Sequence, residues 1–324
     1  MARRRLTRRT FLKGASMTAF TAAVAGHLPP ATHAYAAERP GKLRFGMQTH
    51  PQNASYADIL RAWQEADELG LDSAFVFDHF MPIQSDPAGP CFEGWTLLAA
   101  LAAQTRRVQP GVLVTGNTYR YPAVLAKMAA TVDHVSGGRL ILGMGAGWFE
   151  LEHKAYGIPF RTAGERARRL VEAVEVVKRL FTQERTSFAG KYYRVEEAPF
   201  EPKAVRKPHP PILIGGMGPK VVQPLAARHA DIWHFFAPDD LDETRRIIGK
   251  FDDLCRTAKR DPSAVEKAVS LRPPDLADTK AARARIRALA DAGVRHFILS
   301  LSAPYDRELL RRFGREVAPQ VREG

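Results

Sequence analysis

Residues 142–149, LGMGAGWF, decide between two α/β folds for this chain. Gly143, Gly145 and Gly147 look like the dinucleotide fingerprint that follows the first strand of a doubly wound open sheet. However, Trp148 stands where the fingerprint needs its last glycine, and the run belongs to the fourth strand-like segment rather than the first. The stretch is therefore more typical of a strand end in a barrel of parallel strands, which is the fold we predict.

Strand-like and helix-like segments alternate on both sides of this stretch. Eight short apolar segments predict strands over residues 43–47, 74–77, 109–114, 140–143, 212–214, 232–235, 268–271 and 296–301. Amphipathic segments predict helices between them, among them residues 56–69, 94–104, 122–135, 165–181 and 306–317. Residues 186–195 predict a hairpin outside this repeat. Such alternation predicts an α/β protein, a single (β/α)8 TIM barrel, over residues 37–324.

Residues 1–36 predict an export signal rather than part of the barrel. The pair Arg8-Arg9 lies in TRRTFLK, which matches the twin-arginine signal, and small residues precede a cleavage site after Ala36. A retained membrane anchor is the alternative, but a glycine and two prolines interrupt the apolar run. We expect the twin-arginine translocation machinery to export the folded protein to the periplasm, the cell envelope or the medium.

Composition excludes several other classes of protein. The chain has 324 residues, 45% of them hydrophobic, which is enough for one large core. Its net charge of +13 would suit a nucleic-acid binder, but six of the basic residues lie in residues 1–36, and the remaining +7 is mixed with acids. Two cysteines give no disulfide framework, and no histidine falls at metal-ligand spacing with a carboxylate. We therefore expect neither a metal nor a nucleic-acid partner.

Two strand ends carry residues that suit catalysis and anion binding. His79 follows Asp78 at the end of the second predicted strand, where a tuned histidine can exchange protons near neutral pH. A structural histidine bonded to a loop is the alternative. Residues 215–218 (GGMG) lie between a strand and a helix expected to start near Pro219, so their backbone N–H groups form a candidate phosphate site beside Lys220. A plain turn is the alternative there.

Together these residues resemble the luciferase-like family, in particular its branch that uses the deazaflavin coenzyme F420. The resemblance is strong from about residue 43 to residue 233. Its most specific stretches are FDHF at 77–80, LVTG at 113–116 with RYP at 120–122, VSGGR at 135–139, LGMGAGWF at 142–149 and PPILIGG at 210–216. It implies a TIM barrel that binds a flavin-shaped ring at the carboxyl ends of its strands.

The resemblance also implies roles for individual residues. His79 would be the catalytic proton carrier, Asp78 would orient it, and a non-proline cis peptide would join Leu113 to Val114. Trp148 and Phe149 would shape the substrate pocket. Contacts with the cofactor would come from Met47, Asp78, His79, Leu113, Val114, Thr115, Gly116, Gly147, Trp148, Gly215, Gly216, Met217 and Gly218. Trp148 replaces the glutamate proton donor of the family's sugar-phosphate dehydrogenases, which puts a sugar-phosphate substrate in doubt.

The expected function is an oxidoreductase that transfers a hydride between deazaflavin C5 and a small organic substrate. An FMN-dependent monooxygenase of the same fold is the first alternative, and an exported solute-binding protein is the second, which a single barrel disfavours. F420 carries a polyanionic tail, for which Lys220 and the basic residues near the helix at 165–181 are candidates: Arg161, Arg166, Arg168 and Arg169. Alternatively, these arginines pair with Glu165 and Glu172. The sequence is compatible with a homodimer.

Overall fold

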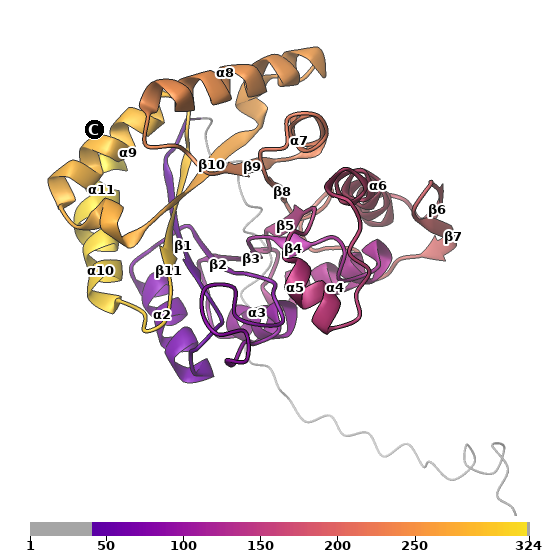
Figure 1. Ribbon diagram of the computed structural model, residues 1–324, viewed down its shortest axis with the longest axis horizontal. Coiled ribbons are helices and arrows are strands. Elements are labelled where there is room, and N and C mark those ends of the chain that lie inside the picture. Colours follow the sequence, from indigo (N-terminus) through magenta and orange to yellow (C-terminus); the bar gives the residue numbers. More distant parts are fainter. Residues whose placement is uncertain (1–40, 323–324) are drawn as a thin grey trace, which may run out of the picture. The chain divides into compact units, whose positions relative to one another are not determined.

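The strands form a nearly closed parallel barrel in the computed structural model, which describes residues 41–322 (Figure 1). Within these residues, one sheet holds nine strand segments in the order β3-β2-β1-β11-β10-β9-β8-β5-β4. Their bounds are β1 Arg44–Thr49, β2 Ser73–Val76, β3 Gln109–Val112, β4 Thr115–Gly116, β5 Leu142–Gly145, β8 Ile212–Gly215, β9 Ile232–Phe235, β10 Glu266–Leu271 and β11 His296–Leu301. A parallel bridge between Gly111 and Ile141 brings the two edges of the sheet together, which confirms the predicted TIM-barrel fold.

The third predicted strand is divided into two segments. β3 pairs with β2, whereas β4 pairs with β5, and the non-proline cis peptide Leu113–Val114 lies between β3 and β4. The cis bond is at the predicted position. The side-chain amide of Gln48 on β1 donates to the carbonyl oxygen of Leu113 at 2.9 Å. Eight predicted strands therefore become nine segments because the backbone leaves the strand conformation at residues 113–114.

Helices lie around the outside of the strands (Figure 1). Their bounds are α2 Tyr56–Glu68, α3 Gly94–Ala103, α4 Pro122–Val135, α5 Glu150–Ala155, α6 Ala163–Thr182, α7 Val222–His229, α8 Leu241–Thr257, α9 Thr279–Asp291, α10 Arg307–Arg312 and α11 Ala318–Arg322. The expected hairpin is present as β6 Arg185–Ala189 and β7 Arg194–Pro199. The last helix differs from the prediction, because a π-helical turn, η3 Phe313–Val317, joins α10 to α11. No described helix is long and apolar enough to cross a membrane.

Side chains along each strand point alternately outward and inward, and they form two apolar layers, one beneath the helices and one inside the barrel. Residues that point outward pack beneath the helices, as Phe45 and Met47 of β1 do with Trp63 of α2. Residues that point inward fill the middle of the barrel with a separate cluster: Phe75, Leu113, Ile141, Leu213, Ile232, Ala268 and Ile298. This inner layer makes the barrel a solid support rather than a channel.

A buried polar network lies at the amino ends of the strands, beneath the inner apolar layer. Glu266 of β10 accepts from the Arg44 guanidinium at 3.0 Å, and its Oε1 lies 2.8 Å from Nδ1 of His296. Ser73 lies 2.7 Å from the other ring nitrogen of His296. Burial alone would raise the pKa of Glu266, but Arg44 and His296 outweigh burial and lower that pKa to about 2. This carboxylate is therefore ionised in the folded protein at neutral pH.

Candidate functional site

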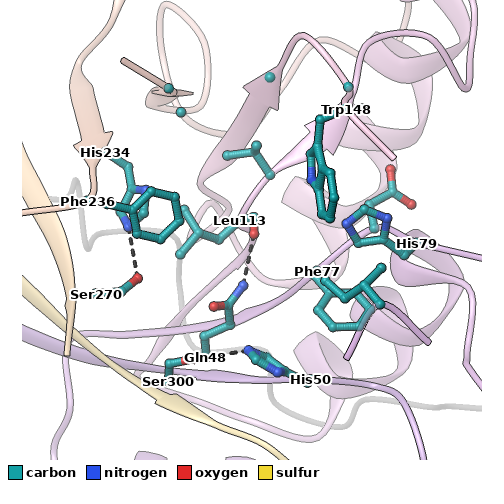
Figure 2. Close-up of a pocket in the computed structure, with 18 of the residues that line it drawn as sticks. Gln48, His50, Phe77, His79, Leu113, Trp148, His234, Phe236, Ser270 and Ser300 are labelled. Atoms are coloured by element: carbon teal, nitrogen blue, oxygen red, sulfur yellow. Dashed lines mark hydrogen bonds between the residues drawn. The ribbon is translucent and has the colours of Figure 1, made fainter. Parts of the chain in front are cut away.

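A cavity of about 860 Å³ opens at the carboxyl ends of the strands. We call it the barrel cavity. Its inner surface comes from alternate strand positions directly above the inner apolar layer, including Gln48, Gly145, Gly215, His234, Ser270 and Ser300. Figure 2 shows His79 and Trp148 on one side of this cavity, Phe236 on the other, and Leu113 between them. Its size lies within the range of pockets that hold a cofactor or a small substrate.

His79 is held by a carboxylate that comes from another part of the chain. Its Nδ1 lies 2.7 Å from Oε1 of Glu152, and Oε2 of Glu152 accepts from the backbone N–H of Phe80 at 3.0 Å. The Tyr119 hydroxyl also donates to Glu152. Burial acts to raise the pKa of Glu152, but its hydrogen bonds with His79, Tyr119 and Phe80 lower the pKa overall. With Nδ1 engaged by an ionised carboxylate, Nε2 is the nitrogen available for proton exchange with a bound molecule.

Asp78 has a different partner from the one expected. Its buried carboxylate accepts from the two terminal nitrogens of Arg120, at 2.5 and 3.0 Å, and Arg120 also contacts Glu93. Burial raises the pKa of Asp78, although the Arg120 guanidinium opposes the shift. Glu93 in turn caps α3 by accepting from the N–H groups of Trp95 and Thr96. Asp78 thus fixes the end of β2 to α3 and α4, and the carboxylate that orients His79 is Glu152.

One wall of the barrel cavity is built from glycines. A Cβ atom added at Gly145 or Gly215 would lie 2.6 or 3.0 Å from a methyl carbon of Val114. One added at Gly147, whose φ is +77°, would lie 2.7 Å from the Thr118 hydroxyl. Gly216 has a φ of +130°, which side chains rarely adopt. The glycines therefore let the Val114 and Thr118 side chains pack against the backbone, and the wall presents backbone and the Val114 side chain to the cavity.

Nine of the residues expected at the site line the barrel cavity: Asp78, His79, Leu113, Val114, Gly116, Gly147, Trp148, Gly215 and Gly216. Five do not, namely Met47, Thr115, Phe149, Met217 and Gly218. Met47 points outward into the helix-facing core, and the Thr115 hydroxyl accepts from the indole N–H of Trp95 at 2.7 Å. Phe149 packs behind His79, with ring centroids 6.0 Å apart. Met217 and Gly218 lie in the loop before α7, which begins at Val222 rather than near Pro219.

Further residues of the site come from other strand ends and from α5. His50, directly after β1 at a strand end expected to carry the site, lines the cavity with its Nε2 3.0 Å from the Ser300 hydroxyl and Gln84 beside its Nδ1. The sequence did not point to Phe236 or Glu152. Phe236 follows β9 and is 70% exposed at the opening. Glu152 lies on α5, a short helix that the apolar pattern does not mark. A carboxylate only a few residues after the fourth strand was the available signal for Glu152.

The basic residues expected around α6 have mostly structural partners. Arg166 donates to the carbonyl oxygen of Gly147 at 3.0 Å, so it supports the cavity wall from outside. Arg169 pairs with Glu165 at 2.9 Å, as the alternative interpretation holds, and Arg168 donates to the Tyr192 hydroxyl. Arg161 and Lys220 are exposed.

Known proteins with similar sequences include oxidoreductases that use F420 or reduced FMN. The chain is 32% identical to an F420-dependent glucose-6-phosphate dehydrogenase of Microbacterium testaceum (strain StLB037) over 232 residues, which cover 71% of this chain and 68% of that protein. It is 32% identical to an FMNH(2)-dependent dimethylsulfone monooxygenase of Pseudomonas putida over 178 residues, 55% of this chain and 47% of that one. Matches to further F420-dependent glucose-6-phosphate dehydrogenases cover only about half of those proteins.

The fold has close structural counterparts as well. The structure of an F420-dependent secondary alcohol dehydrogenase, in complex with an F420-acetone adduct, superposes with a TM-score of 0.77 at 24% identity. That match covers 86% of this chain and 99% of the other, and at this identity it supports the fold alone. The family model described as luciferase-like monooxygenase matches residues 42–322, nearly all of the barrel. On this evidence, the chain belongs to the luciferase-like monooxygenase family.

Proposed function

We propose that this protein is an F420-dependent oxidoreductase that interconverts an alcohol and a carbonyl compound. The observation that carries the proposal is His79, held by Glu152 on the lining of a cavity that glycines at the strand ends also line. The family membership and the F420-dependent relatives support it. The alternative of an exported solute-binding protein is disfavoured by the single barrel and by this family.

The residues present fit a flat tricyclic cofactor. No side chain projects from Gly145, Gly147, Gly215 or Gly216 on this wall, so a flat ring could lie against the backbone there and against the Val114 side chain. Gly147 would lie at the phosphate end of the cofactor and Val114 against its ring, whereas the backbone N–H of Gly216 already donates to the carbonyl oxygen of His234 at 3.1 Å. When bound, the deazaflavin supplies a carbon, C5, that accepts or donates a hydride.

The protein's own contribution is proton transfer and positioning. As an alcohol becomes a carbonyl, Nε2 of His79 takes the hydroxyl proton, and in the reverse direction it returns this proton. Glu152 fixes the ring through Nδ1 and stabilises the positive charge that the imidazole then carries. The Tyr119 hydroxyl donates a hydrogen bond to the same carboxylate, so we assign Tyr119 to positioning rather than to proton transfer. Trp148 and Phe236 restrict the opening and exclude water from the reacting atoms.

Titration with each cofactor tests this function against the FMN-dependent alternative, which the dimethylsulfone monooxygenase keeps open. We expect F420 to bind the cofactor-free protein more tightly than FMN does. We also expect its affinity to fall more steeply with salt, because the F420 tail is polyanionic and the exposed Lys220 and Arg161 are available to contact it. Tighter binding of FMN at every salt concentration would favour the monooxygenase.

A matched pair of glycine variants shows whether the wall holds the cofactor. Gly216→Val places a branched side chain at a φ of +130° on the wall, so we expect F420 affinity to fall by about tenfold or more. Gly293→Val is the control, because it has a similar φ of +111° but precedes β11 at the opposite end of the barrel. Equal loss in both variants, or unchanged affinity in Gly216→Val, would remove this glycine from the site.

We further propose that the protein is exported in folded form. The twin arginine Arg8-Arg9 and the site after Ala36 motivate this, and both lie outside the described residues. Replacing both arginines with lysine should leave uncleaved precursor in the cytoplasm, as seen by fractionation and immunoblotting, because the twin-arginine machinery reads that pair. Export of the double variant at the wild-type level would contradict this route.

A further inference from the structure

We propose that the substrate is a neutral, largely apolar alcohol or ketone, and that Trp148 and Phe236 select it. This inference rests on the proposed function, since it names the substrate class of the same site. The first observation concerns the charged side chains that line the cavity. Among the described residues that line the barrel cavity, Arg272 is the only lysine or arginine.

Arg272 is poorly placed to recognise an anionic substrate. Its guanidinium lies 3.3 Å from carboxylate oxygens of both Asp239 and Asp275, and Asp239 itself lines the cavity. A phosphate ester brings about two negative charges, which proteins usually bind with several cationic or N–H donors. Here it would meet one arginine that already contacts two carboxylates. The glycine wall carries no charged side chain, and it is assigned to the cofactor.

Two large aromatic side chains define the opening instead. Trp148 is 60% exposed and Phe236 is 70% exposed, and they face the cavity from opposite sides (Figure 2). Each ring packs edge-on against a histidine, Trp148 against His79 at 5.8 Å and Phe236 against His234 at 5.5 Å. An apolar molecule between them would remove part of both aromatic surfaces from water, which favours its binding.

Apart from Arg272 and its carboxylate partners, two histidines of the cavity lining, His50 and His234, carry no charge at neutral pH. Burial lowers the pKa of His50, and it lowers the pKa of His234 to about 3, with His296 adding to the latter shift. Both imidazoles are therefore neutral at pH 7. They are hydrogen-bonded to the hydroxyls of Ser300 and Ser270. Such groups can exchange hydrogen bonds with a neutral hydroxyl or carbonyl, but they offer no charge to compensate an anion.

Calorimetric titration of the F420-loaded full-length protein tests this substrate class. The probes are cyclohexanol, cyclohexyl phosphate, which differs from it by the phosphate, and glucose 6-phosphate. We expect cyclohexanol to bind at least about tenfold more tightly than either phosphate ester. Tighter binding of glucose 6-phosphate than of cyclohexanol would overturn the inference.

Three variants assign the selection to particular side chains. Trp148→Glu and Phe236→Ala should each weaken cyclohexanol binding by about tenfold or more, because each removes an aromatic surface from the opening. Leu151→Ala should leave binding unchanged, since Leu151 is 47% exposed on α5 but does not line the cavity. Unchanged affinity in both aromatic variants would overturn their role as selectors.

The two proposals fail in different ways. If F420 does not bind but the cofactor-free chain still prefers cyclohexanol to both phosphate esters, the cofactor assignment is wrong and the substrate class stands. If F420 binds and the preference is reversed, the substrate class is wrong and the cofactor assignment stands.

Discussion

Replacing His79 with alanine is expected to slow turnover of the F420-loaded protein by about 100-fold or more, the usual effect of losing a general acid–base group. Cofactor affinity should stay within about tenfold of the wild type, because the glycine wall that we assign to the cofactor is unchanged in this variant. Stopped-flow measurement of deazaflavin absorption, on any alcohol that the wild type oxidises, separates the hydride-transfer step from binding.

Two further variants separate proton transfer from positioning. Glu152→Gln should slow the same step by a smaller factor than His79→Ala, because the amide still accepts a hydrogen bond but no longer stabilises a positive imidazole. His134→Ala, at an exposed histidine on α4, should turn over like the wild type. Equal rates for His79→Ala and the wild type, with cofactor bound, would make His79 structural.

Replacing Glu266 with glutamine should lower the free energy of unfolding at pH 7 by about 3 kcal/mol, as expected for breaking a largely buried ion pair. The substitution keeps the shape of the side chain but removes the charge that faces Arg44 and His296. Asp253→Asn is the matched control. Asp253 pairs with Arg256 at 2.6 Å on the exposed face of α8, where an ion pair contributes about 0.5 kcal/mol or less.

The pH dependence of this difference has a defined sign. The pKa of Glu266 is about 2 in the folded protein and 4.5 as an ordinary glutamate, so its stabilising effect is complete above pH 4.5. As the pH falls from 4.5 towards 2, the carboxylate becomes protonated in the folded protein too, and the effect is lost. Denaturant titrations of wild type and variant should therefore converge in acid. A difference that stays constant from pH 7 to pH 3 would argue that the altered hydrogen bonding of the amide, rather than the lost charge, explains the destabilisation.

The sequence predicted the barrel because its strands and helices differ clearly in apolar period. It missed the division of the third strand, since residues 113–114 are as apolar as the strand around them and only the backbone changes. It also missed α5, because six residues between two loops are too short to show an amphipathic period.

The sequence predicted those site residues whose role depends on the backbone or on their position at a strand end. It did not predict those whose role depends on the direction of the side chain. The glycines of the wall were found from the sequence because their spacing is visible there. Met47 was misplaced because strand residues alternate between faces, and an error of one position reverses the direction. Likewise, Phe149 was chosen beside Trp148, whereas the second aromatic at the opening is Phe236, which the barrel brings there from β9. Glu152 could be assigned to His79 only once the fold joined them.

The exposure of Trp148 also makes the protein optically readable. Of its four tryptophans, Trp63, Trp95 and Trp233 are fully buried, and Trp148 alone meets water. Indole emission shifts to longer wavelength in a polar environment, so the red edge of the intrinsic fluorescence should come from one residue at the opening of the barrel. A molecule that enters would change that signal without any label, whether or not a reaction follows, and cavity occupancy could be followed in real time in the unmodified protein.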